Sequence, residues 1–172
     1  MLVEGLAMGA FATFYKSGRD PLMVHLMQLT MTDEAFHHKF GKIWADRTIP
    51  KLAPEQRDAI EDWAWEVFQV LLFNLGSPEQ KKHIYEAVGL DWEWVQGAFM
   101  EAMTDANIRD QMQESTNIFR VFIKTLLKAG IITDRTSMNY AAFIDMKELY
   151  GEGDRMVGDD IAEEGIKYLM KL

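Results

Sequence analysis

Two acids and two histidines lie close together in residues 30–44, TMTDEAFHHKFGKIW, within a long stretch that is otherwise mostly apolar. Helical periodicity places Glu34 and His37 on one face together with Met27. A lone carboxylate on such a face would be costly in its charged form unless another group compensated it. A carboxylate and an imidazole at this spacing can bind the same metal ion, and together they suit iron or manganese.

The preceding helix carries another acid in an apolar setting, because Glu4 shares its face with Phe11. The short connection around Gly18 makes the two helices antiparallel neighbours. Glu4 precedes Gly18 by about 14 residues and Glu34 follows it by about 16, which places them ~21 and ~24 Å from the turn. We therefore expect Glu4, Glu34 and His37 to converge.

A Glu on one helix that faces Glu-x-x-His on its antiparallel neighbour resembles half of the metal site of the ferritin-like superfamily. This superfamily includes the ribonucleotide-reductase-like and other non-haem diiron carboxylate proteins, in which two such helix pairs form a four-helix bundle around two irons. The resemblance implies Glu4, Glu34 and His37 as metal ligands. It also implies that Asp33 orients a metal-bound histidine. Tyr15, on the Glu4 face, is a candidate redox or supporting tyrosine, although the pattern favours a buried tyrosine with one hydrogen bond.

The resemblance covers about residues 1–47 and supplies only one Glu-x-x-His where the family has two. Phe36 also stands where oxygenase-type members often have Arg. Either the chain is the C-terminal part of a longer protein, or two copies pair around a twofold axis and complete the site. The implied function is an oxidoreductase or oxygenase that activates dioxygen at a diiron or Mn/Fe site. The alternative is a non-catalytic helical interaction protein, or a fragment, with a vestigial half-site. His38 is expected at the surface.

The remaining periodicity predicts an all-α protein with a ferritin-like bundle. We assign residues 1–150 to one helical domain, with the metal-site hairpin in 1–47 and additional helices in 54–150. Residues 151–172 are expected to form an acidic loop and a tail helix, whose packing partner the sequence leaves open. The expected helices cover residues 3–16, 21–46, 54–75, 77–89, 91–103, 105–128, 137–150 and 161–171.

Composition narrows the function classes. The 172-residue chain is 48% apolar, enough for a packed core, and carries a net charge of −9, which argues against a nucleic-acid partner. It contains no cysteine, which excludes disulfides, thiolate metal sites and cysteine nucleophiles. No apolar run reaches the ~20 residues of a membrane span, and no signal peptide is visible. We therefore expect a cytoplasmic homodimer with no membrane or nucleic-acid partner.

Overall fold

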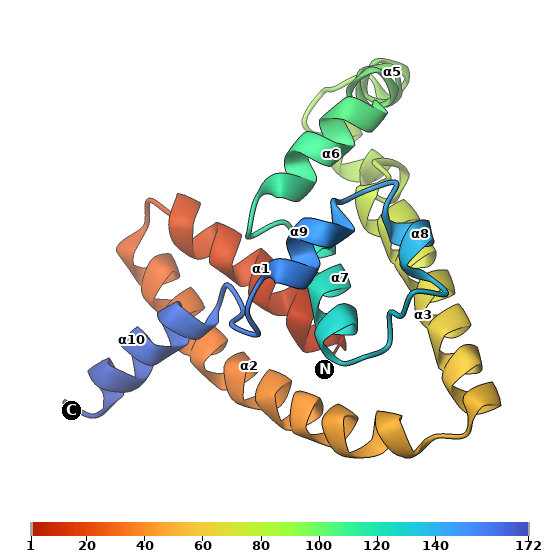
Figure 1. The fold of residues 1–172 in the computed structure, drawn as a ribbon. Coiled ribbons are helices and arrows are strands. Elements are labelled where there is room, and N and C mark those ends of the chain that lie inside the picture. Colours follow the sequence, from red (N-terminus) through yellow and green to blue (C-terminus); the bar gives the residue numbers. More distant parts are fainter. Residues whose placement is uncertain (1, 172) are drawn as a thin grey trace.

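The computed structural model describes residues 2–171, and over those residues it contains helices and connecting segments but no strand (Figure 1). The all-α prediction is confirmed. The α-helices are α1 (Leu2–Ser17), α2 (Pro21–Thr48), α3 (Pro54–Gly76), α4 (Lys82–Ala87), α5 (Trp92–Ala102), α6 (Asp105–Gln113), α7 (Ile118–Lys128), α8 (Ser137–Tyr140), α9 (Met146–Gly151) and α10 (Asp159–Leu169), with 3₁₀ turns η1 (Ile49–Lys51) and η2 (Glu79–Lys81).

The α1–α2 hairpin forms as predicted because its turn carries the right start signals. The side chain of Asp20 accepts hydrogen bonds from the backbone N–H groups of Leu22, at 2.8 Å, and Met23, at 3.4 Å. Pro21 occupies the first helical position, where its missing N–H costs nothing. At the other end Pro50 cannot continue the α-helix, and α2 passes into η1.

The prediction of one continuous helix over residues 105–128 is wrong. The chain breaks between α6 and α7, where the side chain of Asn117 accepts hydrogen bonds from the N–H groups of Phe119, at 2.9 Å, and Arg120, at 3.2 Å. These bonds cap a new helix start. The end of α7 is as expected, because Gly130 has a φ of 70° that suits glycine.

The prediction of one helix over residues 137–150 is also wrong. The carboxylate of Asp145 accepts a hydrogen bond from the N–H of Lys147 at 2.8 Å and caps α9 separately from the single turn of α8. The break lets Tyr140 and Leu149 both point into the core, where both are fully buried.

The largest core cluster lies between α3, α7 and the α8–α9 segment. Phe68, Phe122 and Leu126 are almost completely buried there, and the ring of Phe68 stacks on that of Phe122 with centroids 6.1 Å apart. Burying a side chain of this size stabilises the fold by about 1.5–3 kcal/mol. On the other side of α7 lies α1, which in turn packs against α2.

A polar clamp fixes α3 to the loop after α7. The buried carboxylate of Glu61 accepts hydrogen bonds from the hydroxyls of Thr133, at 2.9 and 3.0 Å, and Thr136, at 3.0 Å. The Nε of Arg135 also donates to it, at 3.2 Å. Burial raises the pKa of the nearby Tyr140 hydroxyl, and the charge of Glu61 adds to the shift. The hydrogen bonds of Glu61 thus join α3 to a loop that lies about 70 residues later in the sequence.

The tail helix α10 packs against α2 of its own chain, which answers the question that the sequence left open. The two helices approach closely at Gly165, where a Cβ atom would lie 2.2 Å from Oγ1 of Thr32. Nearer the C-terminus, the ring of Tyr168 meets His25 edge-on with centroids 4.8 Å apart. The close approach thus depends on the absence of a side chain at position 165.

The acidic loop before α10 is held by bases of α7. Glu152 forms an ion pair with Arg120 and accepts a hydrogen bond from Nζ of Lys124 at 2.8 Å. Burial alone would raise the pKa of Glu152, but the hydrogen bond and charge of Lys124, together with Arg120, lower it below its ordinary value. Further along the loop, Met156 is buried. The predicted acidic loop is therefore attached to the fold.

Candidate functional site

The α1–α2 hairpin carries all three predicted metal ligands. Nδ1 of His37 lies 3.5 Å from Oε2 of Glu34, one turn earlier on α2. On α1, the pKa of Glu4 lies below its ordinary value, and the charge of His37 contributes to that shift. Glu4 and His37 therefore lie within electrostatic reach of each other across the hairpin, as expected from their similar distances from the turn at Gly18.

This neighbourhood lies at the surface of the chain, because α2 is rotated relative to the orientation that its apolar residues suggest. The side chain of Glu34 is 25% exposed and that of His37 is 57% exposed. Met31 and His38 face inward instead, with His38 only 5% exposed. The prediction of a surface position for His38 is wrong. The physical reason is that α1 and α10 pack on the other side of α2.

Large apolar side chains of the same hairpin remain open to solvent. They come from both helices and include Phe14, Met23, Leu26 and Trp44, each at least 46% exposed. Large apolar side chains left in solvent often mark a site of association. The hairpin therefore presents exposed apolar side chains as well as the acidic and imidazole groups of Glu4, Glu34 and His37. We call these exposed residues together the hairpin face.

The two supporting residues predicted from the resemblance lie differently. Asp33 is exposed and, as the neighbour of Glu34 on a helix, is turned about 100° away from it. Tyr15 follows Glu4 by about three turns, or ~16 Å along α1. It packs against the buried cluster of Ala12, Met31 and Ile161. The structure thus brings neither side chain to the group formed by Glu4, Glu34 and His37.

Within residues 2–171 of one chain, no three His, Asp or Glu side chains are grouped closely enough to hold a metal ion. The donor types on the hairpin face suit iron or manganese, since Glu4 and Glu34 offer hard oxygens and His37 offers an imidazole nitrogen. Their number falls short of the set that holds two metals in ferritin-like bundles.

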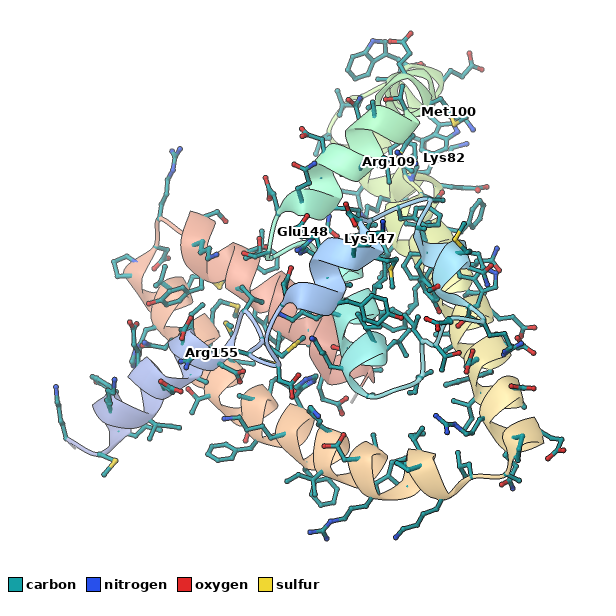
Figure 2. All side chains as sticks on the ribbon, in the orientation of Figure 1. Lys82, Met100, Arg109, Lys147, Glu148 and Arg155 are labelled. Atoms are coloured by element: carbon teal, nitrogen blue, oxygen red, sulfur yellow. The ribbon has the colours of Figure 1, made fainter. Side chains whose placement is uncertain are left out.

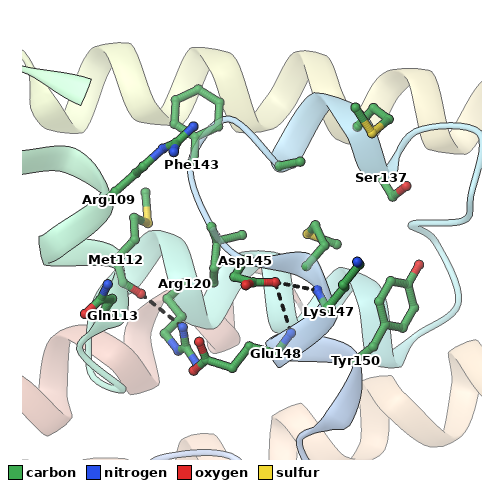
Figure 3. Close-up of a pocket in the computed structure, with 14 residues that line it drawn as sticks. Arg109, Met112, Gln113, Arg120, Ser137, Phe143, Asp145, Lys147, Glu148 and Tyr150 are labelled. Carbon is green, nitrogen blue, oxygen red and sulfur yellow. Dashed lines mark hydrogen bonds and ion pairs between the residues drawn. The ribbon is translucent and has the colours of Figure 1, made fainter. Parts of the chain in front are cut away.

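Sequence reasoning missed a cleft of about 640 Å³ between α6, α7, α8 and α9 (Figure 3). Its charged residues other than Lys147 already serve the fold. Arg120 donates to the carbonyl of Met112 at 3.1 Å and to Glu148 at 3.2 Å, and Asp145 caps α9. Arg109 donates from Nε to a carbonyl between α8 and α9, at 3.1 Å. The cleft therefore offers little unengaged polar chemistry.

No protein-family model, curated protein or solved structure matches the chain. None of the helices within residues 2–171 is long and apolar enough to cross a membrane. The interpretation of the hairpin face consequently rests on its own residues and their geometry.

Proposed function

We propose that the protein is a ferritin-like dimetal-carboxylate protein whose site is completed by a second copy of the chain. The observation that carries the proposal is the exposure of the contacting pair Glu34 and His37 on the hairpin face, with Glu4 of α1 within electrostatic reach of His37. One chain alone offers half of the donors. A surface that is both half a ligand set and apolar is well suited to pair with a copy of itself.

Twofold symmetry accounts for both properties of the hairpin face. A symmetric dimer uses the same surface patch on each copy, so its interface must be self-complementary. Two copies would together supply two carboxylates from Glu4, two from Glu34 and two imidazoles from His37, the donor set that holds two metals in this class of bundle. The same contact would remove Leu26 and Trp44 from water.

The metals implied are iron, with manganese as an alternative in a mixed pair. Glu4 and Glu34 would bind through oxygen and His37 through nitrogen. When bound, such a pair would supply redox chemistry towards dioxygen, which is the chemistry of oxidases and oxygenases. Apolar side chains around the donors would keep bulk water from the site once the two copies pair.

A second candidate function is that of a non-catalytic helical interaction protein. It is favoured by large apolar side chains exposed on α3 and α5, away from the hairpin face. Trp63, Phe73 and Trp94 are each more than half exposed. On this view the association surfaces are the function, and Glu4, Glu34 and His37 are vestigial.

Anaerobic loading with Fe(II), followed by size-exclusion chromatography and metal analysis, separates the two functions. The dimetal proposal predicts about two metals per dimer. The metal should be lost in Glu34→Ala and in His37→Ala. The matched control is His83→Ala, because His83 is an exposed histidine on α4. A metal-free monomer, or metal retained in both hairpin-face variants, would overturn the proposal.

A further inference from the structure

A groove of about 640 Å³ runs between α3 and α5, on elements separate from the α1–α2 hairpin (Figure 1). Each wall is one continuous helical face, because the lining residues on both helices recur at i, i+4 and i+7. Phe143, from the segment between α8 and α9, also lines it. The principal wall residues are Trp65, Gln69 and Leu72 on α3, and Trp92, Gln96 and Phe99 on α5.

The apolar surface of this groove is not covered by the rest of the described chain. No side chain is buried in α4 (residues 82–87) or in α5 (residues 92–102), although α5 is rich in aromatic and methionine residues. Phe73 and Met100, which line the groove, are 71% and 68% exposed. Figure 2 shows Met100 on the outlying part of the molecule formed by α5 and α6. Such a surface typically associates with another molecule.

The charge around the groove is acidic. Glu79 lines it, and none of its described lining residues is Lys or Arg. Glu66 and Glu93 are exposed acids that directly follow the wall residues Trp65 and Trp92 in the sequence. The nearby Lys82 is already engaged, with its Nζ 3.8 Å from Glu86 and 5.6 Å from the centroid of the Trp92 ring.

We propose that this groove binds a basic amphipathic helix of a partner protein. Two helical walls form a channel that suits a third helix, and α5 provides about 16 Å of length, or three turns. Apolar side chains of the partner would pack between the aromatic walls, where methionines adapt to different shapes. Lysines and arginines of the partner would face Glu66, Glu79 and Glu93.

The proposal is independent of the hairpin face and of any metal. The two surfaces lie on different helices, so a defect in one leaves the other intact. Glu34→Ala should therefore leave helix binding unchanged, while changes in the groove should leave metal binding unchanged.

The test uses the full chain and a fluorescein-labelled peptide of Leu and Lys, patterned as an amphipathic helix of about 18 residues, long enough to form a helix when bound. A peptide with Glu in place of every Lys is the matched control. Fluorescence anisotropy should show binding of the basic peptide only. The double variant Phe73→Ala/Met100→Ala should weaken it roughly tenfold or more. Both positions are largely exposed, so circular dichroism should show an unchanged fold.

The control variant Met138→Ala removes an apolar side chain that is 77% exposed and outside the groove, and should bind the basic peptide normally. Binding of neither peptide, equal binding of both, or equal binding by wild type and the double variant would each overturn the proposal. A dimer that forms without peptide and is abolished by Phe73→Ala/Met100→Ala would also overturn it, since the groove would then be filled by a second copy.

Discussion

Removal of the Glu61 carboxylate should destabilise the protein more than any change at an exposed acid on the same helix. The carboxylate is 6% exposed and accepts hydrogen bonds from Thr133, Thr136 and Arg135 at 2.9 to 3.2 Å. Glu61→Ala removes the acceptor for all three. Arg135 is 41% exposed and keeps its contacts with Asp58 and Asp62, whereas Thr136 is 4% exposed and cannot reach water.

The expected cost follows from these environments. A buried hydroxyl left without a partner costs about 1–3 kcal/mol, and the space vacated by the side chain adds to this. The sum is about 3 kcal/mol. For a chain of this size, each kcal/mol lowers the melting temperature by roughly 2–4 °C, so Glu61→Ala should melt about 6–12 °C below wild type.

Thermal unfolding followed by circular dichroism at pH 7 measures the difference. Glu66→Ala is the matched control, because Glu66 is an exposed acid on the same helix and its loss should change stability by no more than about 0.5 kcal/mol. Glu61→Gln should lie between the two, since its amide keeps one oxygen as an acceptor. If Glu61→Ala and Glu66→Ala melt together, the clamp does not hold α3 as described.

Two further changes test the packing of the tail. Gly165→Ala should loosen α10, because its Cβ would lie 2.2 Å from Oγ1 of Thr32. Adding Thr32→Ala should then restore the protection of α10 in hydrogen exchange. If it does not, the close approach of the two helices is contradicted. Lys124 and Arg120 hold the pKa of Glu152 below its ordinary value of 4.5. The contribution of Glu152 to stability is therefore present above pH 4.5 and is lost as the pH falls through the lowered pKa. Urea unfolding should therefore show Glu152→Gln less stable than wild type at pH 7, and a gap that persisted undiminished at low pH would count against the ion pairs.

The helix starts that the sequence predicted well are those in which a capping side chain stands beside proline or follows glycine. Asp20 before Pro21 is one example, and Asp91, which accepts from the N–H of Trp94 at 2.8 Å, is another. Asn117 and Asp145 are equally good caps, but they lie within stretches whose apolar periodicity continues across them. Periodicity alone cannot show that a capping side chain has interrupted a helix.

The positions of the candidate ligands along the helix axes were predictable from the sequence, but the rotation of α2 about its own axis was not. Residue counts on either side of Gly18 fix how far Glu4 and Glu34 lie along the hairpin, whatever else packs on it. The burial of His38 and the exposure of His37 depend instead on which face of α2 meets α1 and α10. Those contacts join residues distant in sequence, so one helix's own pattern could not reveal them.

The α3–α5 groove shows a related limit. The aromatic and methionine residues of α5 predict packing, and the structure leaves Met100, which lines the groove, 68% exposed instead. An amphipathic helix has the same pattern whether its apolar face meets its own core or another molecule. The tertiary structure is needed to tell the two apart.

Native mass spectrometry of the protein after anaerobic Fe(II) loading tests the central claim most directly, because it reads the oligomeric state and the metal content of the same particle. The hairpin face predicts a dimer that carries about two irons. Glu34→Ala should appear without them. Iron bound to a monomer, or a dimer that carries no iron, would contradict a site shared between two copies.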